Sequence, residues 1–280
     1  MIKKICIVGY GTITKNIIKN IKNNSDIFIS VWSRTKNFNE KQIECSNNIE
    51  ELIKDVDLIL SCVPDDKASD EVWQNQVVTD YIRKNQIYCV EMSTLSHKYI
   101  TSWHSFISGL GGRTIESPFT KNRAIHSDKS ISAFLFTKHW SNEVEEFMNT
   151  FCNKIYSFNS LGDPVKFKLI YNTWGAEMLC QFREMYSVVE NEIETKDVAW
   201  NILSNDGWMS LVCSGILPEV KSVDSTVGFK LKYMKKDVNY SQDMFKDSEN
   251  VLYHMIQKKL DNFVNEENEN KDFSLIVKNK

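Results

Sequence analysis

The stretch that decides the fold is residues 5–14, ICIVGYGTIT. Its first four residues form a short apolar run typical of a buried strand, and residues 12–21 carry isoleucines at helical spacing. The loop Gly9-Tyr10-Gly11 joins the two. The first glycine permits a tight turn, the second lets backbone N–H groups approach a ligand, and the N-terminus of the helix favours an anion. The stretch therefore predicts a strand, an anion-binding turn and a helix.

This arrangement is typical of a dinucleotide-binding fold, although the third glycine of the usual fingerprint is replaced by Thr14. We expect Thr14 to crowd the helix against the strand. An ordinary strand-to-helix turn is the alternative interpretation. The residues predicted to contact the cofactor in this loop are Gly9, Tyr10, Gly11, Thr12 and Ile13.

The rest of the first half repeats this alternation of strand and helix. Three further apolar runs predict strands over residues 27–32, 58–63 and 87–90. A capping box at Asn47 and Glu50 predicts a short helix, and a longer helix is expected over residues 72–82. Continuous apolar strands separated by helices indicate a parallel sheet covered on both faces, which is a doubly wound α/β domain.

The pattern changes after Gly162. Helical stretches are predicted over residues 165–192, 197–203, 229–245 and 249–264, with a solvated turn over 266–271 and a possible strand over 273–277. We therefore predict a dinucleotide-binding domain over residues 1–162 and an all-helical substrate and dimerisation domain over residues 163–280, joined by a long helix.

Composition excludes several classes of protein. The 280 residues are 42% hydrophobic and include only four Pro and ten Gly, so a disordered or linker-rich chain is not expected. The net charge of −3 gives no basic field for nucleic acid. No apolar stretch is long enough to span a membrane, no secretory leader is recognised, and seven scattered Cys suggest neither disulfides nor a metal site. We expect a cytoplasmic protein.

The end of the second predicted strand indicates which dinucleotide is bound. An NAD-binding fold usually offers a carboxylate there to the ribose 2′-hydroxyl, whereas this chain has Ser33, Arg34 and Thr35, followed by Lys36. A guanidinium can hold a 2′-phosphate by charge-assisted hydrogen bonds. The residues favour NADP(H); the alternative is that Arg34 is a solvated loop charge.

Four further segments match one family pattern in order and in register. They are VEMST at 90–94, ESPFTKN at 116–122, GDPVKFKLIYN at 162–172, and Phe229 followed by Lys236-Asp237. Together they resemble the β-hydroxyacid dehydrogenase family, which includes 3-hydroxyisobutyrate dehydrogenases and glyoxylate/succinic semialdehyde reductases and is similar to 6-phosphogluconate dehydrogenase. The resemblance covers nearly the whole chain. It implies a homodimer with an interface on the long helix, and cofactor contacts from Val63, Pro64, Thr94 and Lys236.

The chain departs from the family pattern mainly around the substrate. Glu91 and Glu116 replace aspartates, and His97 replaces a proline. The glycine pair of the substrate loop has become Lys121-Asn122. These changes put the family's usual substrates in doubt more than its reaction type.

Lys168 and Asn172 are the predicted catalytic residues. They are four apart on a predicted helix, so both side chains lie on one face. Lys168 could protonate a carbonyl oxygen as a hydride arrives, and Asn172 could bind that oxygen or orient the lysine. Ser93, Thr120, Lys121 and Asn122 are expected to bind the substrate. From spacing alone, Lys168 would be read as a surface lysine of an amphipathic helix.

The sequence therefore predicts an NADPH-dependent oxidoreductase that reduces a small aldehyde or keto acid, with no metal. An imine reductase is the nearest alternative, because residues 31–35 and 161–164 and Tyr171 are similar to those enzymes. A non-catalytic NADP(H)-binding protein is a third reading.

Overall fold

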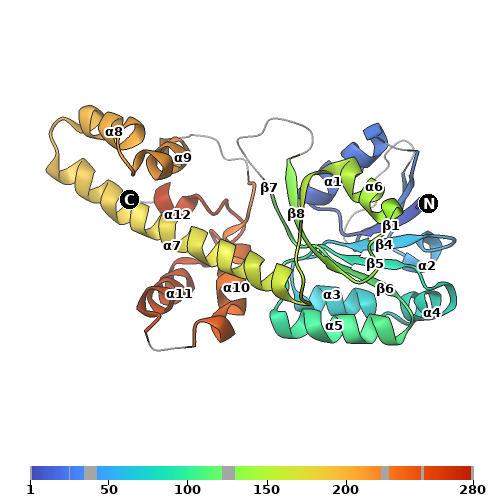
Figure 1. The fold of residues 1–280 in the computed structure, drawn as a ribbon. Coiled ribbons are helices and arrows are strands. Elements are labelled where there is room, and N and C mark those ends of the chain that lie inside the picture. Colours follow the sequence, from blue (N-terminus) through green and yellow to red (C-terminus); the bar gives the residue numbers. More distant parts are fainter. Residues whose placement is uncertain are drawn as a thin grey trace. The chain divides into compact units, whose positions relative to one another are not determined.

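The computed structural model describes residues 2–24, 26–34, 43–121, 130–221, 227–246 and 249–278. The chain forms two compact units, Met1–Lys168 and Leu169–Lys280, and each is described by itself. The first unit is a sheet covered by helices, and the second consists of helices (Figure 1). The long helix α7, Asp163–Glu192, begins in the first unit and continues through the second.

The sheet of the first unit contains nine strands within the described residues, in the order β3-β2-β1-β4-β5-β6-β8-β7, with β9 beside β8. The first six strands along this order are parallel, which confirms the predicted doubly wound α/β domain. β8 runs antiparallel to β6 and β7, and β9 runs parallel to β8. The strands are β1 Lys4–Val8, β2 Phe28–Trp32, β3 Glu44–Ser46, β4 Leu58–Ser61, β5 Tyr88–Glu91, β6 Arg113–Glu116, β7 Phe119–Lys121, β8 Ile131–Thr137 and β9 Cys152–Ser157.

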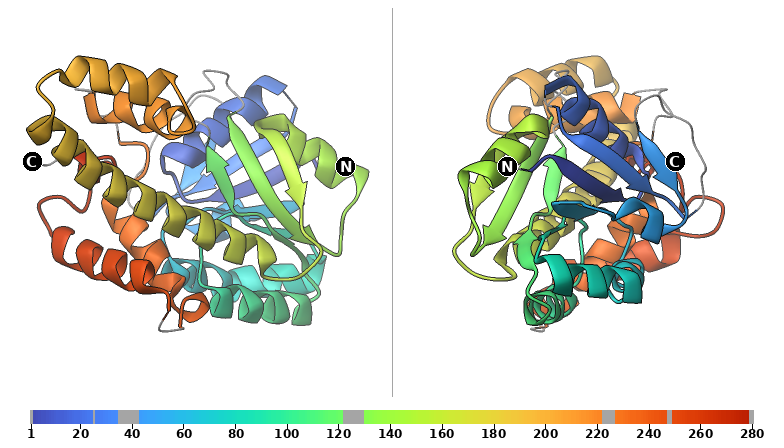
Figure 2. Two further views of the ribbon diagram at one scale, coloured as in Figure 1. Left: turned by 60° about the vertical axis from the view of Figure 1, so that its left-hand side comes forward. Right: turned by 90° about the vertical axis from the view of Figure 1, so that its right-hand side faces the viewer.

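Helices cover both faces of this sheet. Figures 1 and 2 show α1 and α6 over one face and α3 and α5 over the other. The helices are α1 Thr12–Asn24, α2 Ile49–Leu52, α3 Asp66–Trp73, α4 Gln76–Asn85, α5 His97–Gly109 and α6 Asn142–Phe151. Ile17, Ile18 and Ile21 of α1 are buried against the apolar residues of β1 and β4 in one core cluster, and Ile13 packs against it partly buried. The burial of this cluster is the main favourable contribution to the stability of the unit.

Two local predictions in this unit are wrong. The helix predicted over residues 72–82 is interrupted, because Asn75 caps a new helix by accepting hydrogen bonds from the N–H groups of Val77 and Val78. The short helix α2 is capped by Asn48, which accepts from Glu50 N at 3.1 Å, and not by Asn47. An asparagine that caps a helix fixes the residue at which that helix begins, and at Asn75 this effect outweighs the continuous apolar periodicity.

The second unit is helical, as predicted. Its elements after α7 are α8 Lys196–Asn205, α9 Ser210–Lys221, α10 Leu231–Tyr240, the short 3₁₀ helix Gln242–Met244, α11 Val251–Phe263 and α12 Leu275–Lys278. A shared apolar core includes Ala176 on α7, Leu231 on α10 and Tyr253 on α11. None of the described helices is long and apolar enough to cross a membrane.

The strand predicted over residues 273–277 is wrong, because this segment contains α12. The Asp272 carboxylate accepts a hydrogen bond from Ser274 N at 3.0 Å, which begins a turn there. Ile276 and Val277 are buried in the core of the unit. A five-residue apolar run fits a buried helix as well as a buried strand, so this error follows from the ambiguity of the pattern.

Candidate functional site

The glycine loop adopts the conformation that the sequence predicts. Gly9 has a φ of +101°, and a Cβ there would lie 2.5 Å from the carbonyl oxygen of Cys62. Only glycine satisfies both constraints. A Cβ at Gly11 would meet no atom within 4 Å, so the backbone there borders open space at the N-terminus of α1. The loop therefore leaves room for an anionic group beside the first turn of the helix.

Thr14 is held in the loop by hydrogen bonds to Gly11. Its buried hydroxyl accepts from Gly11 N at 2.8 Å and donates to Gly11 O at 3.1 Å. This arrangement resembles a capping box, in which the third helical residue binds the backbone N–H of the cap. Thr12 is exposed and Ile13 is half-buried, while Lys15 lies over the Tyr10 ring at 4.7 Å.

The residues predicted to bind the adenosine end of the dinucleotide follow β2. Ser33 is buried, and the Arg34 side chain is exposed and lies 3.3 Å from the carboxylate of Glu71 on α3. Thr35 lies outside the described residues, as does Lys36. Sequence reasoning missed Glu71, because no local signal relates residues that lie 37 positions apart.

The loops after β4 and β5 are joined to each other at the same edge of the sheet. Val63 N donates to Ser93 Oγ at 2.8 Å, and Pro64 follows on the exposed surface. Ser93 itself is buried, whereas Thr94 is partly exposed. Because β1 and β4 are neighbours, the Val63 loop lies at the same strand ends as the glycine loop. Ligands of open α/β sheets bind at these carboxyl ends.

Glu91, at the end of β5, is fully buried and hydrogen-bonds three residues around it. Its carboxylate accepts from Ser69 Oγ at 2.6 Å, from Trp73 Nε1 at 2.8 Å and from Ser93 N at 2.9 Å. Complete burial raises the pKa of the Glu91 carboxyl, and the hydrogen bonds from Ser69, Ser93 and Trp73 oppose that shift. Glu91 thus fixes the Ser93 loop against α3.

Glu116 holds the start of the helix that carries Lys168. Its fully buried carboxylate accepts from Gly162 N at 2.9 Å and from Val165 N at 3.0 Å. His104 Nε2 lies 3.6 Å from Glu116 Oε2. The Gly162 N–H lies directly before α7 and the Val165 N–H lies in its first turn, where backbone donors have no intrahelical acceptors. Sequence reasoning identified Glu116 as a family departure but missed this contact.

Gly162 is required at the turn before α7. Its φ is +81°, and a Cβ would lie 2.7 Å from the ring of His97. His97 occupies the position at which the family pattern has proline. The glycine, the histidine and Glu116 therefore hold the turn that precedes α7.

Lys168 lies two residues past the first turn of α7 and is only 8% exposed. This burial contradicts the reading of Lys168 as an ordinary surface lysine. Thr120 and Lys121 lie on β7, where Thr120 is partly exposed and Lys121 is exposed. Asn122 lies outside the described residues.

In the second unit, Asn172 is held by a buried carboxylate. Asn172 is 7% exposed, and its Nδ2 donates to Asp237 Oδ2 at 2.6 Å. Asp237 is 1% exposed, and its other oxygen lies 3.0 Å from Lys236 Nζ. Because a carboxylate only accepts, the nitrogen of the Asn172 amide must face Asp237, which leaves Oδ1 directed elsewhere as an acceptor.

Lys236 also borders a groove of about 300 Å³ along one face of α10. The lining residues are Lys232, Lys235, Lys236, Asn239 and Tyr240. Lys236 Nζ lies 5.0 Å from the centre of the Tyr240 ring. The groove is open to solvent and lined by α10 alone, and its lysines favour an anionic occupant.

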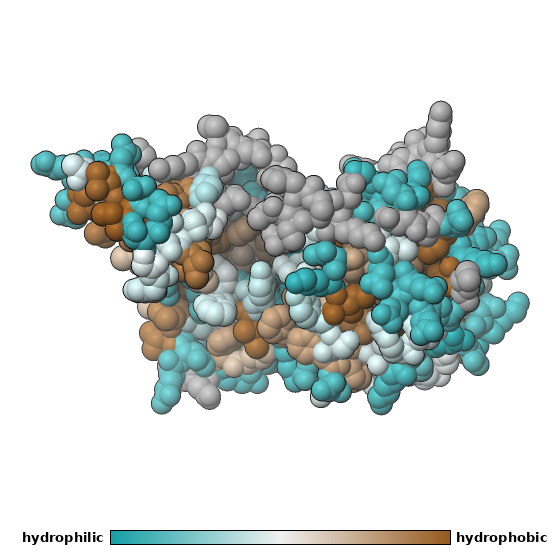
Figure 3. Space-filling view, turned by 45° about the horizontal axis from the view of Figure 1, so that its top comes forward, coloured by the Kyte–Doolittle hydropathy of each residue, from teal (hydrophilic) through white to brown (hydrophobic). Residues whose placement is uncertain are grey.

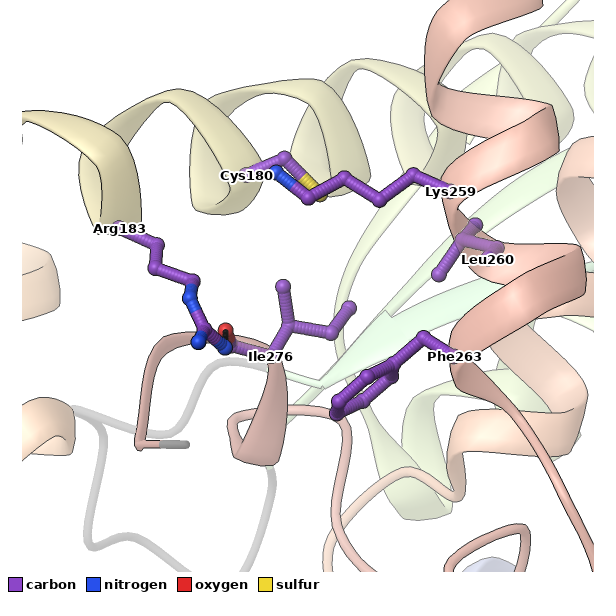
Figure 4. A pocket seen from close by; sticks show the side chains of 6 residues that line it. All are labelled: Cys180, Arg183, Lys259, Leu260, Phe263 and Ile276. Carbon is purple, nitrogen blue, oxygen red and sulfur yellow. Dashed lines mark hydrogen bonds between the residues drawn. The ribbon is translucent and has the colours of Figure 1, made fainter. Parts of the chain in front are cut away.

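A second cavity in this unit is too small to hold a substrate. It measures about 30 Å³ and lies between α7, α11 and α12 (Figure 4). Arg183 crosses its edge and donates to the carbonyl oxygen of Ile276 at 3.0 Å. This volume is comparable to that of one water molecule. Among the described residues, no cluster of His, Cys, Asp and Glu could hold a metal ion.

Comparisons with known proteins agree with this architecture. Residues 4–128 match the family described as the NAD binding domain of 6-phosphogluconate dehydrogenase. The fold matches 3-hydroxyisobutyrate dehydrogenase from Mycobacterium tuberculosis, solved with L-serine, with a TM-score of 0.81, 13% identity and coverage of 99% of this chain and 98% of that one. An imine reductase from Myxococcus stipitatus, solved with NADP+, gives a TM-score of 0.60 at 14% identity, with 98% of each chain covered. These findings confirm the predicted resemblance to the β-hydroxyacid dehydrogenase family.

Among curated proteins, the chain is similar in sequence to a nuclear factor. The human cytokine-like nuclear factor N-PAC is 22% identical over 242 residues, which cover 84% of this chain and 43% of that protein. The chain therefore spans less than half the length of the curated relatives that it matches.

Proposed function

On the resemblance of this chain to the β-hydroxyacid dehydrogenase family, we propose that it is an NADPH-dependent oxidoreductase that reduces a small aldehyde or keto acid. The observation that carries the proposal is the burial of Lys168, which is 8% exposed on the helix that also bears Asn172. Burying a lysine is costly, so a functional reason for its position is favoured over a solvated role. The matched NAD-binding family supports nicotinamide-dependent oxidoreduction.

The first unit provides the residues that would hold the dinucleotide. The open backbone at Gly11 and the N-terminus of α1 suit its pyrophosphate, and Arg34 suits the 2′-phosphate. Val63, Pro64 and Thr94 follow the neighbouring strands β4 and β5. Lys236, in the second unit, borders a groove whose charge suits an anionic cofactor. When bound, the reduced nicotinamide supplies a hydride from C4 to the carbonyl carbon.

Lys168 completes the reduction by donating a proton to the carbonyl oxygen. A lysine ammonium within reach of the carbonyl oxygen can serve as the general acid. The C=O bond becomes CH–OH, and the lysine is left neutral until it regains a proton from solvent. Serving as a base in alcohol oxidation would instead require the pKa to be lowered.

Asn172 orients the proton donor. Its Nδ2 is committed to Asp237, so Oδ1 can accept from an ammonium one helical turn earlier on α7. This favours the orienting role over donation to the substrate oxygen. Asp237 and Lys236 keep the amide in that orientation through contacts of 2.6 Å and 3.0 Å.

Substrate binding is assigned to Ser93, Thr120, Lys121 and Asn122. Thr120 and Lys121 are accessible on β7, and a cation at 121 suits a substrate with an anionic group. The Ser93 side chain accepts from Val63 N and also hydrogen-bonds the Glu91 carboxylate, so its contribution would come through the loop that it fixes.

A homodimer formed through the second unit is also proposed. Several large apolar side chains are exposed there, including Trp208 at 83%, Leu211 at 86% and Trp174 at 64%. Figure 3 shows hydrophobic surface at the left-hand end of the helical unit. Exposed apolar patches of this kind mark interfaces. Light scattering should give twice the mass of one chain, and Trp208→Glu with Leu211→Glu should give the monomer.

The function is tested by following NADPH absorbance with a panel of small aldehydes and keto acids, and with cyclic imines in parallel. We expect turnover with at least one carbonyl compound and none with the imines. Turnover of imines alone would favour the imine reductase reading, which the shared fold with the Myxococcus stipitatus enzyme supports. Tight NADPH binding without turnover of any compound would favour a non-catalytic binding protein.

A further inference from the structure

The proposed 2′-phosphate ligand already has an anionic partner in this structure. Arg34 Nη1 lies 3.3 Å from Glu71 Oε2, with 67% of the arginine side chain and 50% of the glutamate side chain exposed. Arg34 follows β2 directly, whereas Glu71 lies in the second half of α3. Neither the glycine loop nor α7 depends on this contact.

We propose that Glu71 sets the cofactor preference by competing with the 2′-phosphate of NADPH for Arg34. The inference rests on the proposed binding of NADPH by the first unit. It makes Glu71 a specificity-determining residue that weakens NADPH binding while leaving NADH binding unchanged.

Two physical arguments fix the direction of the effect. The carboxylate and the phosphate accept hydrogen bonds from the same guanidinium, so the donor held by Glu71 is lost to the phosphate unless the ion pair breaks. If both anions remain beside Arg34, they repel each other. NADH has a neutral 2′-hydroxyl in place of the phosphate and escapes both costs.

The exposure of the pair limits the size of the effect. Ion pairs between solvent-exposed side chains are weak because water and salt screen them. We therefore expect the Glu71 carboxylate to weaken NADPH binding by about two- to fivefold at low ionic strength. Raising the salt concentration should reduce this factor.

The test is a double-mutant cycle read by direct titration, which needs no substrate. The Kd of NADPH and of NADH is measured for the unmodified protein, Glu71→Gln, Arg34→Ala and the double variant. Glu71→Gln should tighten NADPH by about two- to fivefold and change NADH by less than twofold. In the Arg34→Ala background the same change should have a smaller effect, because the contested donor is gone and only the repulsion between the two anions remains.

Asp80→Asn is the matched control. Asp80 lies on α4 and forms an exposed ion pair of its own, 2.7 Å from Arg83, so its removal changes net charge equally away from the glycine loop. It should leave both Kd values unchanged. An equal gain from Asp80→Asn would reduce the effect to net charge and overturn the proposal.

Weaker or unchanged NADPH binding in Glu71→Gln would also overturn it, because Glu71 would then orient Arg34 or play no part. If NADPH still binds more tightly than NADH in that case, the proposed cofactor assignment survives. Failure of the unmodified protein to bind either dinucleotide would overturn both proposals.

Discussion

Replacing Glu116 with alanine should destabilise the protein more than most single substitutions. The fully buried carboxylate accepts two backbone hydrogen bonds, from Gly162 N at 2.9 Å and Val165 N at 3.0 Å. Each hydrogen bond to a charged group contributes about 1.5–3 kcal/mol. The cost of burying the carboxylate offsets part of this sum, so we expect a net loss of about 3 kcal/mol.

The assay is thermal unfolding followed by circular dichroism. A loss of about 3 kcal/mol corresponds to a fall in Tm of about 6–12 °C for a unit of this size. Glu116→Gln should lose about half as much, because its oxygen still accepts one N–H while its amide nitrogen faces the other. Glu146→Ala, an exposed carboxylate on α6, is the control and should change stability by less than about 0.5 kcal/mol. A Glu116→Ala variant as stable as this control would refute the role of Glu116 at the start of α7.

Two further outcomes are expected. Asp237→Asn should lower kcat by about tenfold, because the Asn172 amide can then rotate and exchange its nitrogen and oxygen. The double variant in which Asn172→Asp is combined with Asp237→Asn should restore the Tm of the unmodified protein but not its kcat. A restored kcat would exclude the orienting role of Asn172. In thiol labelling of the native protein, partly exposed Cys62 should react at pH 8 and be protected by NADPH, since its carbonyl lies beside Gly9. Cys6 should stay unlabelled, because burial raises its pKa to about 12, and labelling of Cys6 in the folded protein would contradict that burial.

The elements that the sequence predicts are those with strong local signals. The strand, glycine loop and helix over residues 4–24 are confirmed, since the apolar run and the isoleucine spacing lie within one stretch. The long helix α7 is also confirmed. The points at which one helix ends and the next begins are less predictable. Asn75 interrupts a continuous periodic pattern by capping a new helix. The strand predicted over residues 273–277 is wrong because a short apolar run fits a buried helix as well as a buried strand.

The partners of the candidate site residues could not be predicted for a different reason. Glu116 contacts Gly162 and Val165 across 46 and 49 positions, and Asp237 contacts Asn172 across 65. Such contacts depend on how distant elements pack, and no periodicity encodes them. The resemblance to the family predicts catalytic roles for Lys168 and Asn172, and the structure shows that the Asn172 amide donates to the Asp237 carboxylate.

The most direct test of the proposed chemistry is Lys168→Met, a variant that keeps an unbranched side chain one atom shorter and removes the ammonium. With a carbonyl substrate from the panel and saturating NADPH, we predict a fall in kcat of about 10²- to 10⁴-fold. The Kd of NADPH, measured by titration, should stay within twofold of the unmodified protein. A Lys168→Met variant that keeps near-normal kcat would contradict the assignment of Lys168 as the proton donor.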